Sequence, residues 1–160
     1  MRSRRRLRRL EKTGTVDDNT RPRLVIDTNV FVSGLISGTG SPAQILKAIQ
    51  QRKVIHLVSD PIVEEYLRVL DYPQIRKFKK ITDEFVADIA AYLVYQTERV
   101  ELSSSIKLSP DPDDNVFLET AVDGKADWLV TNDRADLLTL RAGQGIPIVS
   151  AREAAIRIEL

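Results

Sequence analysis

Short apolar runs alternate with longer amphipathic stretches along the chain from residue 23 onward. The apolar runs are continuous rather than interrupted at every second position, which is typical of strands buried on both faces of a parallel sheet. We predict five strands, over 23–27, 54–58, 99–102, 127–131 and 146–149. Strands separated by helical stretches in this way predict an α/β fold with a parallel sheet covered by helices.

Helix start signals stand between the predicted strands. Ser41 before Pro42 predicts an N-cap followed by a first turn, and the same kind of pairing recurs before Pro61. The predicted helices cover 42–51, 60–72, 83–97, 113–124 and the residues after Ser150. We expect Asp113 to be the N-cap of the fourth of these helices.

The composition excludes several kinds of chemistry. The 160 residues include no cysteine and a single histidine, His56, which excludes disulfides, thiolate catalysis and zinc sites built from Cys or several His. Catalysis would therefore use carboxylates, hydroxyls, amides, lysines or a bound cation. No apolar run approaches the roughly 18 residues of a membrane span, so we expect no membrane association and a cytoplasmic location.

The charge of the chain is divided unevenly. Residues 1–23 hold nine Arg and Lys against three acidic residues, a balance of +6, which leaves −5 for the remainder of a chain with net charge +1. We predict a basic, disordered extension over 1–22 before a single domain over 23–160. Two interpretations of the extension stay open, a phosphate-binding arm and a merely solvated segment.

Acidic residues follow two of the predicted strands. Asp27 ends the first strand, and Asp133 follows the strand that ends near Thr131. Ligands of open α/β sheets bind beyond the carboxyl ends of the strands, so both carboxylates are candidates for one site.

Helical wheels add one carboxylate from each of two helices. In SDPIVEEYLRVL, Glu65 lies beside the apolar arc, whereas Glu64 lies on the polar side. In the helix after residue 112, Asp114 falls inside the apolar arc and Glu119 falls outside it. Glu65 and Asp114 are therefore the better candidates for an inward-facing site.

Each of these carboxylates also has a simpler interpretation. Asp27 and Asp133 could serve as helix N-caps or in Asx-turns, and Glu65 could be solvated at the edge of its helix. The metal hypothesis depends on convergence, because four carboxylates at one sheet edge repel one another unless they take up protons or bind a cation. Ligands that are all oxygen suit Mg²⁺ or Mn²⁺.

Three segments resemble the PIN domain, a family of metal-dependent ribonucleases that includes the VapC-like toxins of toxin–antitoxin pairs. They are VIDTNVF (25–31), SDPIVEEYLRVL (59–70) and SPDPDDNVFLETAVDGKADWLVTND (109–133), which RADLL follows. The third segment is the most specific. The basic extension is not part of the family's pattern.

The resemblance implies a three-layer α/β/α sandwich, a homodimer, an RNA substrate cleaved endonucleolytically, and an antitoxin as a possible partner. It also implies that one or two Mg²⁺ or Mn²⁺ ions and four catalytic carboxylates share the site. The implied catalytic and metal-binding residues are Asp27, Glu65, Asp114 and Asp133, with Thr28, Asn29 and Thr131 in support.

Alternative interpretations remain. The chain could be a catalytically inactive PIN-like module that binds RNA or a protein. A haloacid-dehalogenase-like phosphatase or a response-regulator receiver would also place Asp27 after its first strand, but Asn29 stands where the phosphatase pattern requires a second Asp. For RNA contact, the basic run RKFKK (76–80) is a candidate, as is the extension.

Overall fold

We describe a computed structural model of the chain that covers residues 20–107, 112–133, 142–143 and 145–159. The run RADLL lies outside these residues, as does all but the last part of the predicted basic extension.

In the described part of the chain, six strands form one sheet in the order β3-β2-β1-β4-β6-β5. Every neighbouring pair is parallel except β5 and β6, which are antiparallel. The strands are β1 (Arg23–Ile26), β2 (Ile55–Val58), β3 (Glu98–Arg99), β4 (Trp128–Val130), β5 (Ala142–Gly143) and β6 (Ile146–Val149). The five predicted strands and their parallel sheet are thereby confirmed, and β5 is an addition.

Helices connect the strands. They are α2 (Thr28–Ser37), α3 (Gly40–Gln50), α4 (Asp60–Leu70), α5 (Pro73–Arg76), α6 (Asp83–Tyr95), α7 (Pro112–Asp123) and α9 (Ala151–Ile158). Among the described residues, no helix is both long enough and apolar enough to cross a bilayer.

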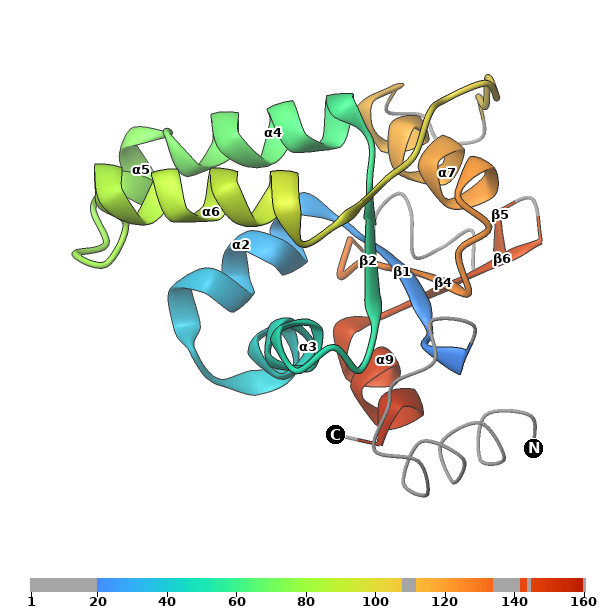
Figure 1. The fold of residues 1–160 in the computed structure, drawn as a ribbon, viewed down its shortest axis with the longest axis horizontal. Coiled ribbons are helices and arrows are strands. Elements are labelled where there is room, and N and C mark those ends of the chain that lie inside the picture. The colour runs from blue at the N-terminus through green and yellow to red at the C-terminus, as the bar shows by residue number, and fades with distance from the viewer. Residues whose placement is uncertain (1–19, 108–111, 134–141, 144, 160) are drawn as a thin grey trace.

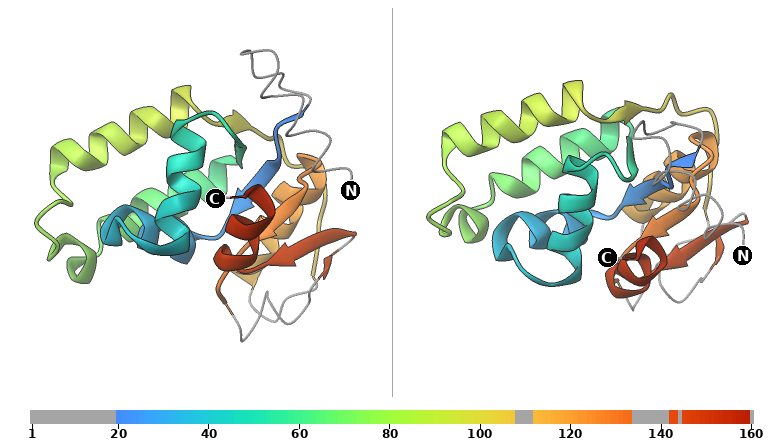
Figure 2. Two further views of the ribbon diagram at one scale, coloured as in Figure 1. Left: turned by 90° about the horizontal axis from the view of Figure 1, so that it is seen from below. Right: turned by 60° about the horizontal axis from the view of Figure 1, so that its bottom comes forward.

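The helices cover both faces of the sheet (Figure 1). α7 packs on β1 and β4 on one face, while α9 packs on β4 and β6 on the other face and contacts α3. α4 and α6 lie side by side and project from the sheet as a pair (Figure 2). This arrangement is the predicted three-layer α/β/α sandwich.

The helix α2 was not expected from the sequence. It begins directly after Asp27, and its residues Val30, Phe31 and Val32 are all buried. Its exposed residues Asn29, Ser33 and Ser37 are spaced four apart and share one face, so an amphipathic period is present although the helix was not predicted. At Gly34, where α2 approaches α3 closely, an added Cβ would lie 2.9 Å from the carbonyl oxygen of Pro42.

Candidate active site at the carboxyl edge of the sheet

The sheet reverses its order of connection at β1. β1 pairs with β2 on one side and with β4 on the other, and Ile26 lies opposite Val130 at the carboxyl end. Such a switch point opens a crevice in which open α/β sheets bind ligands. Asp27 and Asp133 both follow strands that end there, as the sequence predicted.

Asp27 occupies the N-cap position of α2, but its side chain makes no capping hydrogen bond. Its Oδ2 instead accepts a hydrogen bond of 2.8 Å from the hydroxyl of Thr131, and that hydroxyl accepts one of 3.0 Å from the backbone N–H of Asp133. One hydroxyl therefore connects the Asp27 carboxylate to the backbone of Asp133. The expectation that Thr131 supports the acidic residues agrees with this contact.

Burial makes Asp27 electrostatically unfavourable as an anion. Its side chain is 5% exposed, and this burial is the main cause that raises its pKa, with a smaller contribution from the charge of Asp133. The Thr131 hydroxyl and the Thr28 backbone N–H lower the pKa but do not cancel the effect. The site thus holds a carboxylate that its own partners do not fully compensate.

Glu65 approaches the same crevice from α4. It is half-buried, whereas Glu64 is exposed, so the helical wheel oriented this helix correctly. Burial again raises the pKa of Glu65 most strongly, and the charges of Asp27 and Asp113 add to it, while the Thr28 hydroxyl and Arg68 lower it. Glu65 and Asp27 are therefore within electrostatic range of each other.

The first turn of α7 carries Asp113 and Asp114, of which Asp113 lies near Glu65. The prediction that Asp113 is the N-cap was wrong, because the helix already begins at Pro112, a residue favoured at the first helical position. Asp114 is buried, at 9% exposure, and Asp113 is exposed and near enough to Glu65 to raise its pKa. Sequence reasoning missed this role of Asp113, whose only signal was its position next to Asp114.

A buried pair of hydroxyls connects the helices that carry these side chains. Ser59, at the N-cap of α4, lies 2.8 Å from the hydroxyl of Thr120 on α7. Thr120 also donates a 2.8 Å hydrogen bond to the carbonyl of Val116, so Ser59 is left as the donor of the pair. This contact fixes α4 and α7, and with them Glu65 and Asp114, relative to each other.

A second buried network lies behind Asp27. Tyr66 donates a hydrogen bond to the carbonyl of Ile26, the residue before Asp27. The Nε2 of His56 is 3.3 Å from the Tyr66 hydroxyl, and its Nδ1 is 2.8 Å from that of Tyr92. The Tyr66 hydroxyl donates its proton to the Ile26 carbonyl, so it can only accept from His56. Nε2 of His56 is therefore the donor to Tyr66, and Nδ1 accepts from Tyr92. The histidine is neutral, since burial lowers the pKa of His56 to about 3.

The donor set fits a hard divalent cation. All four predicted ligands offer oxygen atoms, and the Thr28 hydroxyl is buried without a hydrogen bond of regular geometry to any described residue, although it lies near Glu65. Within the described ranges, no three acidic or histidine side chains gather closely enough to form a ready metal site. Beside Glu65 and Asp113 opens a pocket of about 300 Å³, which Arg68 and Val116 also line.

Comparisons with known proteins agree with this architecture. The uncharacterized protein MJ1680 of Methanocaldococcus jannaschii is 31% identical over 119 residues, which cover 74% of this chain and 75% of that protein. The crystal structure of VapBC2 from Rickettsia felis, bound to a DNA fragment from its promoter, contains a chain of similar fold. That chain matches with a TM-score of 0.53 and 13% identity, over 80% of this chain and 98% of its own length.

The family is settled by a match that covers most of the domain. Residues 23–135 match the PIN domain, and this span includes both strand-end carboxylates and the helices that carry Glu65 and Asp114. The match excludes the phosphatase and receiver alternatives that the position of Asp27 had left open. This chain belongs to the PIN domain family.

Proposed function

We propose that this PIN-domain protein is a Mg²⁺- or Mn²⁺-dependent endoribonuclease. PIN domains are in general nucleases, and one observation supports the proposal most directly. Asp27 is buried as a poorly compensated carboxylate at the switch point of the sheet, connected through Thr131 to Asp133 and in electrostatic range of Glu65. A buried site of this kind favours a bound cation.

The proposed roles divide among the four carboxylates. Asp27, Asp114 and Asp133 would hold one or two ions, and Glu65 would bind an ion directly or through a water molecule. When bound, the cation supplies a coordinated water of lowered pKa and stabilises charge on the scissile phosphate. Thr131 orients Asp27, and Arg68, a cation at the rim of the otherwise acidic pocket, is suited to contact a substrate phosphate.

The test is cleavage of an end-labelled single-stranded RNA. The protein should cut the RNA with Mn²⁺ and lose this activity in EDTA. Asp27→Asn and Asp133→Asn should each lower the rate at least about a hundredfold, because each removes a charged metal ligand. Asp88→Asn, which makes the same change on an exposed face of α6, is the matched control and should cleave normally. A folded Asp27→Asn variant with full activity would contradict the assignment of Asp27 as a metal ligand.

The resemblance to VapC-like toxins extends the proposal to a partner. The similar structure from Rickettsia felis is a VapBC2 complex bound to promoter DNA, which supports a toxin–antitoxin role and an antitoxin that binds this chain. We also propose a homodimer. If the adjoining gene encodes a small protein, that protein should form a stoichiometric complex with this chain and block cleavage, and light scattering would give the mass of the free protein.

A catalytically inactive PIN-like module is the second candidate. It is favoured by one observation, the lack of any close group of three metal-binding side chains among the described residues. Retained RNA binding without cleavage in Mn²⁺ would favour the module. Cleavage that depends on Asp27 would exclude it.

A further inference from the structure

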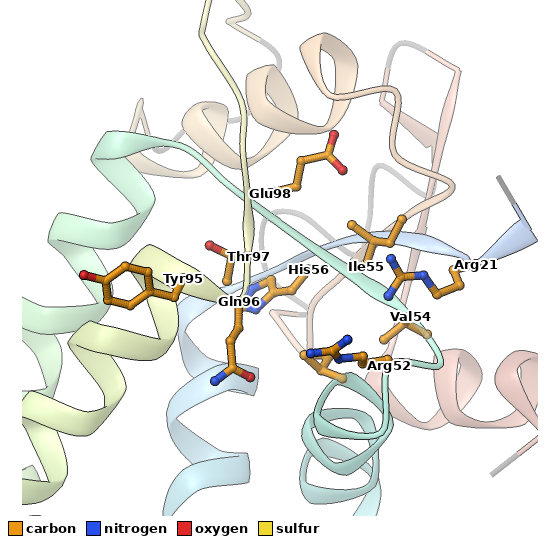
Figure 3. Close-up of a pocket in the computed structure, with 10 residues that line it drawn as sticks. Arg21, Arg52, Val54, Ile55, His56, Tyr95, Gln96, Thr97 and Glu98 are labelled. Carbon is orange, nitrogen blue, oxygen red and sulfur yellow. The ribbon is translucent and has the colours of Figure 1, made fainter. Parts of the chain in front are cut away.

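A second pocket, of about 580 Å³, opens at the edge of the sheet opposite the carboxylates (Figure 3). It is lined by the end of α3, the start of β2, the end of α6 and the start of β3. Ile55 and His56, the first residues of β2, form part of its wall, whereas Ser59 at the other end of β2 lies level with Asp27. Four residues of strand separate the two sites, a distance of roughly 13 Å.

Two arginines line the pocket. Arg21 and Arg52 enter it from two different segments, and Figure 3 shows both guanidinium groups turned into it. Arg52 makes no ion pair with any residue that the structure describes. Glu98 also lines the pocket, but both of its carboxylate oxygens bind Arg23, at 2.9 and 2.6 Å. Glu98 therefore does not compensate Arg52.

The backbone holds Arg52 in an unusual conformation. The N–H of Lys53 donates to the carbonyl of Ala48, and the N–H of Arg52 donates to that of Ile49, so the end of α3 is a Schellman motif. The left-handed position of this motif, usually glycine, is occupied by Arg52 with φ 57°. The chain thus places a guanidinium at a position where its backbone favours glycine.

We propose that this pocket binds a phosphate of the RNA backbone, away from the point of cleavage. The inference rests on the proposed function, because it takes RNA as the ligand. Guanidinium groups bind phosphate oxygens through paired hydrogen bonds, and the ring of Tyr95 at the rim is 83% exposed and available for base stacking. Cations beside an exposed aromatic ring are the combination used to bind single-stranded nucleic acid.

The run RKFKK is a weaker candidate for the same contact. Arg76 is engaged by Asp71 at 3.0 Å and by Asp83 at 2.9 Å. Lys80 donates to the carbonyl of Ile36. Two of the four cations in that run therefore have partners within the protein. Arg52 has no such partner among the residues that the structure describes.

Arg52→Gly is the sharpest test, because it removes the guanidinium from a position whose backbone already suits glycine. Lys125→Gly is a matched control. Lys125 has φ 51° in an equivalent Schellman motif at the end of α7, it is exposed, and it does not line the pocket. Both variants lose one positive charge at a left-handed residue, and circular dichroism verifies that both are folded.

The measurement is fluorescence anisotropy of a labelled single-stranded RNA in EDTA, over a series of salt concentrations. We expect Arg52→Gly to weaken binding about fivefold at low salt and to reduce the slope of log K against log salt by about 0.7, the value for one lost phosphate contact. Lys125→Gly should bind within about twofold of the unaltered protein.

The outcomes separate the two proposals. Equal RNA binding by Arg52→Gly and Lys125→Gly would overturn the phosphate site, whether or not the protein cleaves RNA. Binding that depends on Arg52 without any cleavage in Mn²⁺ would support the site and overturn the ribonuclease proposal instead. If Arg52→Gly loses affinity for adenosine monophosphate but not for RNA, the pocket holds a free nucleotide and RNA is the wrong ligand.

Discussion

Asp27 shows how much one residue can reveal from the sequence. Its position after a buried strand identified it as a candidate, and an N-cap role remained as the simpler interpretation. The structure places Asp27 at an N-cap position without a capping hydrogen bond. Its carboxylate instead accepts a hydrogen bond from the hydroxyl of Thr131. That partner lies 104 residues away in the chain, so local sequence could suggest it only through the family resemblance.

The raised pKa of Asp27 leads to a prediction about stability. A carboxyl whose pKa is higher in the folded state stabilises the fold only when protonated, so ionised Asp27 destabilises the protein at neutral pH. In EDTA at pH 7.5, Asp27→Asn should therefore increase the free energy of unfolding by about 1–3 kcal/mol. Urea denaturation measures the change, which should shrink as the pH falls into the range where Asp27 takes up its proton.

Mn²⁺ supplies the control for that experiment. The ion should stabilise the unaltered protein and have little effect on Asp27→Asn, because the variant lacks a central ligand. If Asp27→Asn is the less stable protein in EDTA, the carboxylate is compensated and the argument from burial fails.

At the scale of elements, the sequence predicted most helices and strands because their start signals are local. Ser150 is the N-cap of the helix that it was expected to open, and Ser59 is the N-cap of α4, which was expected to start at Ser59 or Asp60. The prediction that Ser41 is an N-cap was wrong, because α3 already begins at Gly40, with Thr39 as its N-cap. The helix α2 was missed because only Asp27 separates it from β1, so that no turn signal marks its start, and β5 was missed because two residues carry no pattern at all.

The helix α7 also binds the segment that precedes it. Asp123 accepts hydrogen bonds from the backbone N–H groups of Ser103 and Ser104, and Glu119 accepts one from that of Ile106. The Ser104 contacts are the main cause that lowers the pKa of Asp123 to about 2. No sequence pattern predicted this attachment, because its bonds join a loop to side chains on the exposed side of a helix.

Replacement of Asp123 should loosen that segment without unfolding the protein. In Asp123→Asn, the amides of Ser103 and Ser104 should exchange with deuterium about tenfold faster, while the unfolding free energy falls by less than about 1 kcal/mol, because the carboxylate is solvent-screened. Because the pKa of Asp123 is lowered, its contribution is present above about pH 4 and is lost toward pH 2. Unchanged exchange rates at both amides would contradict this role.

At the scale of the whole molecule, charge is distributed between the two edges of the sheet. Asp27 and Asp133 follow strands that end at the carboxyl edge, and Arg21 and Arg52 lie at the opposite edge. The sequence showed the imbalance between its first 23 residues and the remainder. It did not show that Arg52 shares a pocket with Arg21, because that contact depends on how α3 and β2 pack.

The buried histidine should make the whole fold sensitive to acid. His56 has a pKa of about 3 in the folded protein against about 6.5 when unfolded, so stability falls as the pH drops below 6.5. The expected loss between pH 7 and pH 5 is about 2 kcal/mol, measured by urea denaturation. In His56→Gln this loss should disappear, even if the variant is less stable at every pH; an equal loss in both proteins would contradict the prediction. The pKa values of Asp27 and Glu65 are raised, so protonation of these two carboxyls stabilises the folded state as the pH falls and opposes the effect of His56.

The neutral state of His56 also simplifies enzyme kinetics. This side chain is the single histidine of the chain, and it is buried and hydrogen-bonded to two tyrosines. A profile of the cleavage rate against pH, recorded between pH 5.5 and 8.5, should therefore show no change caused by titration of His56. Any inflection in that interval would report the site carboxylates or a metal-bound water, so a simple kinetic titration could follow the catalytic centre without interference from the rest of the protein.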